Sequence, residues 1–194
     1  RMEFGASRAG LLAAALCLAC VTGPAAAKAE RIYLCSGYGC VYKKSMNLGA
    51  AAKQRLAAIM AGGRSSASAE RAAISKAVRY FETLATQTMG VRDGAKSGPG
   101  GARVYGQMDC IDESRNTRTL LTYLQRHGLL HHHTVRRNAA RGFFIDIRYP
   151  HATAVVRAKD GRDWAIDSWY EPAGGAPDIM QLSEWKKRGV RGER

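Results

Sequence analysis

The sequence predicts a single α+β domain in which helices come first and an antiparallel β-sheet follows. Of its 194 residues, 46% are hydrophobic, which is enough apolar side chain for one buried core. Apolar residues recur every three or four positions in segment 66–89, and the period changes to two from Leu129 onward. Helical segments followed by strand segments are typical of this fold class.

The first 27 residues are predicted to be a secretory signal peptide. Arg8 precedes the apolar run 10–21, Pro24 follows it, and the small residues of 25–29 match a cleavage site. A bilayer-spanning helix needs about 20 apolar residues, so this run is too short to be a membrane anchor.

The mature protein is therefore expected to be periplasmic or secreted, as one domain over 28–190 with a basic tail over 186–194. Three of the five cysteines lie beyond the signal peptide. Cys35 and Cys40 bracket a Gly-rich tetrapeptide, and an oxidising compartment would permit a small disulfide between them. Cys110 would then be a free thiol, whose commonest role is that of an inert buried residue.

Three helices are expected. An Ala-rich segment, 50–61, ends at a Gly-Gly pair, and segment 66–89 has the clearest apolar periodicity, with Ser68 as its predicted cap. The Gly-rich stretch 91–106 is typical of an exposed loop. A third helix is expected over 109–127, with acidic residues in its first turn and a glycine just after its end.

Strand signals surround these helices. Residues 30–47 have strand-like and loop-like character, and 179–185 form a last short element. The period-two segments that make up the expected sheet are 131–135, 143–149, 151–158 and 164–170. Lys159-Asp160-Gly161 is a hairpin signal between the last two of them.

Cys110, His151 and Asp167 are the candidate catalytic residues. Acyl transfer by a thiol needs a nucleophile, a base and a group that orients the base. At a helix N-terminus the backbone N–H groups lower the pKa of a thiol and can form part of an oxyanion hole. A three-residue hairpin loop at 159–161 would make His151 the diagonal neighbour of Asp167 on one sheet face, whereas a two-residue loop would put them on opposite faces.

Each of the three also has a plain structural interpretation. Cys110 could be a buried inert cysteine, His151 a sheet histidine after a proline, and Asp167 a strand-edge carboxylate. Their occurrence together, with the cysteine at the start of a helix, favours the triad.

At these residues the chain resembles the transglutaminase-like superfamily. Segment 108–113 looks like the family's cysteine helix, and 150–167 looks like its histidine strand, turn and aspartate. The bacterial transglutaminase-like cysteine peptidases are the nearest branch, since their Asp-Cys-x-Asp core is similar to 109–112. The resemblance covers about residues 100–170 and implies a papain-like fold, with the cysteine helix packed on an antiparallel sheet.

The triad and the resemblance predict an exported cysteine hydrolase or acyltransferase that acts on amide bonds through a thioester. Water is the simpler acceptor, and transfer to an amine stays open. Gln107 is a candidate second oxyanion donor. The alternative function is a catalytically silent transglutaminase-like binding module for an anionic cell-envelope component.

No cofactor is expected. Asp109, Asp112 and Glu113 are calcium candidates of low rank, because they fit no EF-hand loop and acidic residues commonly cap a helix start. A zinc site at His127 and the histidines of 131–133 is disfavoured, since no cysteine or carboxylate stands at ligand spacing.

The charge balance points to an anionic partner. Thirty Lys and Arg residues against sixteen Asp and Glu residues give a net charge of +14. No nucleic-acid-binding motif accompanies this charge, so no nucleic-acid partner is expected. The expected partners are a peptide or protein substrate and acidic cell-envelope material, with no transmembrane helix after signal cleavage.

Overall fold

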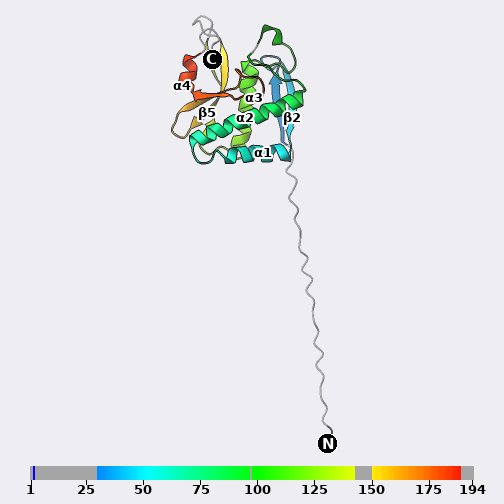
Figure 1. Ribbon diagram of the computed structural model, residues 1–194, viewed down its shortest axis with the longest axis vertical. Helices are drawn as coiled ribbons and strands as arrows, with labels where there is room; N and C mark the ends of the chain where they lie inside the picture. The colour runs from blue at the N-terminus through cyan, green and yellow to red at the C-terminus, as the bar shows by residue number, and fades with distance from the viewer. Residues whose placement is uncertain (1, 3–29, 97, 143–149, 189–194) are drawn as a thin grey trace.

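The computed structural model describes residue 2 and residues 30–96, 98–142 and 150–188 (Figure 1). The predicted signal peptide, the strand expected at 143–149 and the end of the basic tail lie outside the described residues. The described elements are β1 (Glu30–Ser36), β2 (Tyr42–Leu48), α1 (Ala50–Ala61), α2 (Ala67–Met89), the 3-10 helix η1 (Pro99–Gly101), α3 (Cys110–Arg126), β3 (His133–Val135), β4 (Ala139–Arg141), β5 (His151–Ala158), β6 (Asp163–Asp167), β7 (Asp178–Gln181) and α4 (Leu182–Lys187). Helices and antiparallel sheets together confirm the α+β class.

Strands β1 and β2 form an antiparallel hairpin that stands apart from the main sheet. Ile32, Leu34, Met46 and Leu48 alternate with exposed residues and point to the core, which is the period-two pattern of a sheet with one buried face. The hairpin packs against α3, α2 and α1.

Helix α1 has the bounds that the sequence predicted, and α2 differs at its cap. Ser66, rather than Ser68, is the N-cap, because its side chain accepts a hydrogen bond from the Ala69 N–H. Gly90 ends α2 with a left-handed φ of 73°, a conformation that glycine adopts without steric cost.

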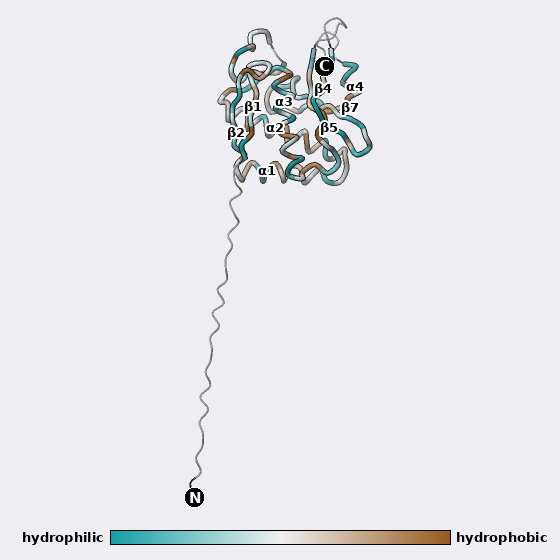
Figure 2. Tube along the Cα trace, turned by 180° about the vertical axis from the view of Figure 1, so that it is seen from behind, coloured by the Kyte–Doolittle hydropathy of each residue, from teal (hydrophilic) through white to brown (hydrophobic). Residues whose placement is uncertain are grey.

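Helix α3 runs between the β1–β2 hairpin and the main sheet (Figures 1 and 2). Leu120, Leu121 and Leu124 are completely buried on it. Asp109 is its N-cap, and Asp112 completes a capping box. The cysteine-bearing end of α3 is thus held by side chains encoded next to the cysteine itself.

The main sheet has the strand order β3-β5-β6-β7, and β4 pairs with the first part of β5. The β5–β6 hairpin has the predicted loop, with Gly161 at a left-handed φ of 86°. Ala154 pairs with Ile166 and Arg157 with Asp163, so the register inferred from a three-residue loop is confirmed.

Three expectations about this half of the chain need correction. The strand expected over 164–170 ends at Asp167, because the chain turns there. The element expected over 179–185 is divided between β7 and α4, and β4 was not expected at all. None of the described helices is long and apolar enough to span a membrane.

Candidate active site

Cys110 is the first residue of α3, next to strand β5. The Asp109 carboxylate accepts hydrogen bonds from the N–H groups of Ile111 and Asp112, at 3.1 and 2.9 Å, and so fixes the helix start. Cys110 is a half-buried free cysteine. The backbone N–H of Ala152 on β5 donates a hydrogen bond to its thiol, so the sulfur faces the strand that carries His151.

His151 and Asp167 form a buried pair where β5 begins and β6 ends. Their Nε2 and Oδ2 atoms are 2.7 Å apart, and the side chains are 2% and 1% exposed. The indole N–H of Trp185 donates to the same Oδ2 at 2.7 Å, and the Trp169 N–H reaches Oδ1 at 3.4 Å. A carboxylate that accepts these bonds places the imidazole proton on Nε2 and leaves the lone pair on Nδ1.

Aromatic rings surround the imidazole of His151. The ring centroids of Trp169, Tyr170 and Trp185 lie 4.6, 5.6 and 5.6 Å from it. These contacts restrict the rotamer of the histidine and exclude water from most of its surface. Trp169 and Tyr170 lie in the turn after Asp167, where the sequence had predicted that the strand would continue.

A cavity of about 390 Å³ brings Cys110 and His151 together. Its other walls include Tyr38 from the β1–β2 loop, Ile111 and Ala152. The Nδ1 atom of His151 is buried and has no hydrogen-bond partner among the described residues. The nitrogen that carries the lone pair is therefore the unsatisfied atom of the pair, as a general base at this cavity requires.

The pKa of the Cys110 thiol is raised to about 11, which contradicts the sequence-based expectation of a lowered pKa. Burial is the main cause, and the carboxylates of Asp109 and Asp167 add to it, whereas the Ala152 N–H acts in the opposite direction. Two nearby negative charges and partial burial thus outweigh the helix N-terminus, and the resting cysteine is a neutral thiol.

Gln107 does not reach this cavity. Its side-chain amide donates to the Arg92 carbonyl at 3.3 Å, and its backbone carbonyl accepts from the Gly37 N–H. Gln107 is also absent from the residues that line the cavity. The Cys110 N–H, in the first turn of α3, is therefore a better oxyanion donor than the Gln107 side chain.

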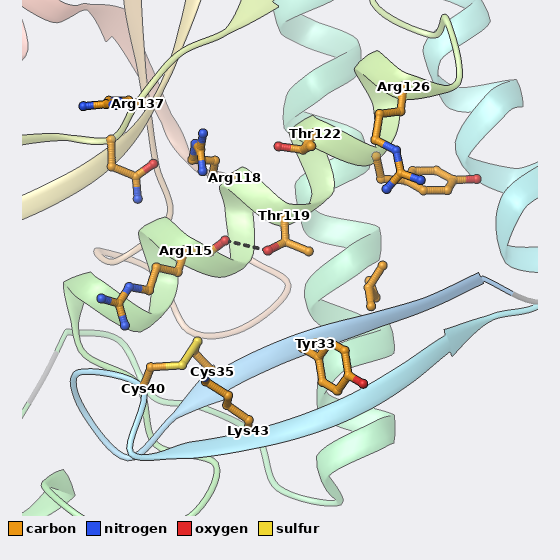
Figure 3. Close-up of a pocket in the computed structure, with 13 residues that line it drawn as sticks. Tyr33, Cys35, Cys40, Lys43, Arg115, Arg118, Thr119, Thr122, Arg126 and Arg137 are labelled. Atoms are coloured by element: carbon orange, nitrogen blue, oxygen red, sulfur yellow. Dashed lines mark hydrogen bonds between the residues drawn. A yellow bond between two sulfur atoms is a disulfide. The ribbon is translucent and has the colours of Figure 1, made fainter.

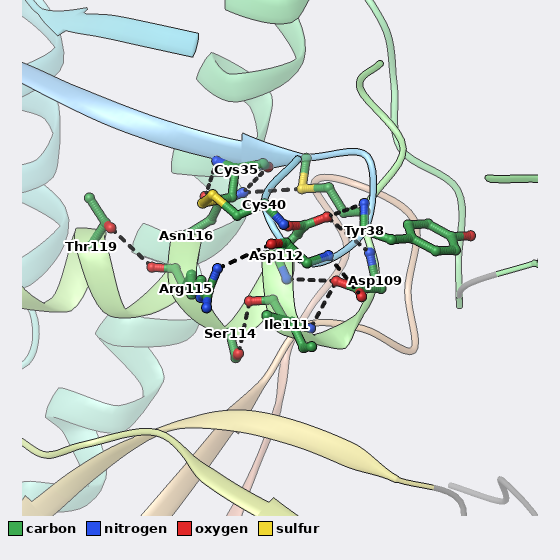
Figure 4. Close-up of a disulfide and its surroundings, with 12 residues drawn as sticks. Cys35, Tyr38, Cys40, Asp109, Ile111, Asp112, Ser114, Arg115, Asn116 and Thr119 are labelled. Carbon is green, nitrogen blue, oxygen red and sulfur yellow. Dashed lines mark hydrogen bonds between the residues drawn. A yellow bond between two sulfur atoms is a disulfide. The ribbon is translucent and has the colours of Figure 1, made fainter. Parts of the chain in front are cut away.

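The carboxylates of the three calcium candidates accept hydrogen bonds from the protein itself, and Figure 4 shows two of them, Asp109 and Asp112. Asp112 accepts from the Tyr38 N–H at 2.8 Å, and Asp109 accepts from the Gly39 N–H at 3.0 Å, while Glu113 accepts from the Ser168 hydroxyl. These carboxylates hold loops rather than converge on one point. Among the described residues, the only group spaced for a metal ion is Cys35, Cys40 and Asp112, and the cysteines of that group are joined to each other.

The predicted disulfide between Cys35 and Cys40 is confirmed (Figure 4). The Asn116 side chain on α3 accepts from the Cys35 N–H at 2.7 Å and donates to its carbonyl at 2.9 Å. The disulfide loop is thereby fastened to the helix that begins with Cys110, and its Tyr38 forms one wall of the cavity. A disulfide of this kind is compatible with an oxidising compartment.

Sequence reasoning missed Arg141 and Trp185. Arg141 pairs with His151 in the β4–β5 register and is 5% exposed. Its guanidinium donates to the Trp185 carbonyl and, at 2.8 Å, to the Tyr170 hydroxyl. No sequence signal connects Trp185 to Asp167, because they belong to different elements that only the fold brings together.

A comparison of the chain with family models, curated proteins and solved structures finds no match.

Proposed function

We propose that the protein is a cysteine hydrolase or acyltransferase that acts on amide bonds. One observation carries this proposal: Cys110 and His151 line a single cavity, and the Nδ1 of His151 has no partner among the described residues while its Nε2 is bound by Asp167. Nucleophile, base and orienting carboxylate are the parts that covalent acyl transfer needs. The papain-like arrangement and an exported location belong to the same proposal.

The chemistry begins from a neutral thiol. The Cys110 proton moves to Nδ1 of His151 as the sulfur attacks the amide carbonyl, so the base works while the nucleophile forms its bond. The negative oxygen of the tetrahedral intermediate is stabilised by the Cys110 N–H at the start of α3. Collapse of the intermediate breaks the C–N bond, and Nδ1 returns its proton to the leaving amine.

The thioester formed on Cys110 is then cleaved by an acceptor. Water gives a carboxylic acid and regenerates the thiol, and an amine gives a new amide by the same route. His151 removes the acceptor's proton in both cases. Water is the simpler acceptor and the one that we favour.

The test is acylation of Cys110 by an activated ester, p-nitrophenyl acetate, followed by intact-mass spectrometry. The wild-type protein is expected to gain one acetyl group on Cys110, and Cys110→Ala none. His151→Ala should slow acylation about 10²–10⁴-fold, the usual contribution of a general base. His127→Ala, at an exposed histidine, is the matched control and should acylate at the wild-type rate.

Equal acylation rates in wild type and His151→Ala would overturn the proposal, since the imidazole would then have no part in activating the thiol. A reporter amide with and without an added primary amine separates the two acceptors. Released acid alone indicates a hydrolase, and a new amide indicates an acyltransferase.

A catalytically silent binding module is the second candidate. The raised pKa of Cys110 favours it, because a thiol that is neutral at rest reacts slowly unless a base assists. In the described part of the chain, no hydrogen bond joins that thiol to His151. The same acylation series decides: a wild-type protein as slow as His151→Ala is a binding module.

A further inference from the structure

A second and larger hollow lies between the β1–β2 hairpin and the exposed side of α3 (Figure 3). We call it the basic groove. Its volume is about 860 Å³, and Lys43, Arg115, Arg118, Arg126 and Arg137 line it. None of the described residues that line it is acidic. A concave surface lined by one sign of charge concentrates ligands of the opposite sign.

The cations of α3 recur at helical spacing. Arg115, Arg118, Thr122 and Arg126 line the groove from the same helix, at intervals of three, four and four residues that place them on one face. Thr119, four residues after Arg115, lines it beside them. From the first to the last of them the helix rises roughly 16 Å, at 1.5 Å per residue. The groove therefore offers an extended row of cations rather than one compact anion site.

Several of these side chains are already held in place. The Nε of Arg118 donates to the Arg136 carbonyl at 3.0 Å, and Arg115 donates to the Gly39 carbonyl at 3.4 Å. Arg126 lies 3.3 Å from Glu30. A guanidinium has five N–H donors, so each keeps donors for a ligand while losing less conformational entropy on binding.

The remaining lining suits a sugar chain. Tyr33 is 56% exposed and lines the groove from β1, and Thr119 and Thr122 line it from α3 (Figure 3). The Thr119 hydroxyl donates to the Arg115 carbonyl at 3.0 Å and can still accept a hydrogen bond. Tyrosine rings pack against apolar sugar faces, hydroxyls match sugar hydroxyls, and guanidinium groups bind carboxylates with two parallel hydrogen bonds.

We infer that the basic groove binds a linear acidic polysaccharide whose sugars carry carboxylate groups. A lipid headgroup surface fits less well, because the cations line a hollow and a bilayer is flat. A nucleic acid fits less well because the Cys35–Cys40 disulfide favours an oxidising compartment, where nucleic acid is scarce. The carboxylates pair with the row of cations, and the sugar rings lie along Tyr33.

The groove is separate from the candidate active site. The two hollows share no lining residue, and the loop that contains Tyr38 lies between them. Cys110 takes no part in the groove, so polysaccharide binding does not depend on whether the thiol is catalytic.

The experiment is a calorimetric titration of the mature protein with an oligogalacturonate that is long enough to span the groove. Lys43→Gln/Arg137→Gln and Arg115→Gln/Arg118→Gln are each expected to weaken binding about tenfold, from the loss of two charge-assisted contacts. Arg55→Gln/Lys76→Gln removes the same charge from the α1–α2 side and should leave the Kd unchanged. If Arg115 and Arg118 prove necessary for folding, the Lys43→Gln/Arg137→Gln variant still tests the groove.

A neutral maltooligosaccharide of equal length should not bind, and added salt should weaken binding of the acidic chain. Cys110→Ala should bind like the wild type, which separates this inference from the proposed function. The inference is overturned by any of three results: no binding of oligogalacturonate, an equal loss in the Arg55→Gln/Lys76→Gln control, or tighter binding of single-stranded DNA of matched charge.

Discussion

Among the described residues, two buried histidine–carboxylate pairs connect elements of the fold, and they differ in what surrounds them. His133 on β3 lies 2.8 Å from Glu70 on α2, and both side chains are fully buried. His151 on β5 lies 2.7 Å from Asp167 on β6, and both are almost fully buried. Distance and burial are nearly equal, so neither property distinguishes a structural pair from a candidate catalytic one.

The Glu70–His133 pair is satisfied on every side. Glu70 also accepts hydrogen bonds from the backbone N–H groups of His131 and His132, and the second ring nitrogen of His133 lies 3.3 Å from the Arg71 guanidinium. These bonds fasten the first turn of α2 to the start of the main sheet. A fully bonded polar network of this kind stabilises one arrangement of the core.

The His151–Asp167 pair is incomplete at one atom. In the part of the chain that the structure describes, Nδ1 of His151 has no partner, and His151 lines the cavity of Cys110. A buried unpaired polar atom costs free energy, about 1–3 kcal/mol. The unsatisfied nitrogen, rather than the presence of a histidine–acid pair, therefore marks the candidate site.

The sharpest test of this difference exchanges a carboxylate for an amide in each pair. Asp167→Asn removes the acceptor that holds the Nε2 proton, so the proton shifts to Nδ1 and the base is lost. Acylation of Cys110 should fall about 10³–10⁴-fold, the order known for the equivalent change in serine proteases. Glu70→Gln should leave the acylation rate within about threefold, because it acts on a pair that does no chemistry. Equal losses in both variants would erase the distinction.

The second prediction concerns stability, where the change at Glu70 should have a larger effect than the change at Asp167. Glu70→Ala leaves His133 and two backbone N–H groups unpaired in the core, and should lower the free energy of unfolding by about 3–5 kcal/mol. Asp167→Asn keeps an oxygen for the Trp185 indole and should cost only about 1–2 kcal/mol. Urea denaturation followed by circular dichroism measures both. A larger loss in Asp167→Asn would contradict the structural role assigned to Glu70.

Sequence reasoning reached the parts of the site that depend on local rules. Helix α3 begins at Cys110 because Asp109 is a capping residue, and the β5–β6 register follows from Gly161 in a three-residue loop. The cap placed Cys110 at the start of a helix, and the register placed His151 against Asp167. The Cys35–Cys40 pair was predictable for the same reason, since the flexible loop between the cysteines is local.

Contacts between distant elements were not predictable from one sequence. Trp185 reaches Asp167 only because α4 packs on β6. Gln107 does not line the cavity of Cys110, and its side-chain amide donates to the Arg92 carbonyl instead. The predicted direction of the Cys110 pKa shift was wrong for a similar reason. The helix N-terminus is visible in the sequence, whereas the burial of the thiol and its closeness to Asp167 appear only in the fold.

Buried carboxyl groups without a histidine partner form a third class. Glu82, Asp93 and Glu113 lie between α2 and α3, where Ser168 donates to Glu113 at 2.8 Å and the Gly174 N–H donates to Glu82 at 2.7 Å. Burial raises the pKa of Glu82 to about 7 and of Asp93 to about 6, and it raises the pKa of Glu113 well above its usual value. Burial acts on Glu70 in the same direction, but hydrogen bonds from His133 and two N–H groups lower its pKa overall.

The third prediction follows from these opposite directions. A carboxyl with a raised folded pKa binds more protons in the folded state, so its contribution to stability falls as pH rises from about 4.5 to about 7. Glutamine does not ionise, so Glu82→Gln avoids the cost of a buried charge at high pH. It should raise the free energy of unfolding at pH 8 by roughly 2 kcal/mol. Glu70, with a lowered pKa, stabilises the fold above about pH 4.5, and that contribution falls in acid.

Thermal unfolding of wild type and Glu82→Gln across pH 4–9 measures this contrast. The two curves should converge in acid and separate above neutral pH. Curves that separate in acid instead would reverse the assignment and place an ionised, stabilising carboxylate at Glu82.

The smallest effect is expected at the thiol, where the same electrostatics act on the candidate nucleophile. Asp109→Asn keeps an N-cap of equal quality and removes one of the charges that raise the pKa of Cys110. Alkylation of Cys110 by iodoacetamide at pH 9 should therefore become about threefold faster, as the thiolate fraction rises. Glu184→Gln, which removes an exposed charge on α4, should not change the rate. The wild-type rate should climb with pH towards about 11, and a plateau near neutral pH would mean that the helix N-terminus, rather than burial and charge, controls this sulfur.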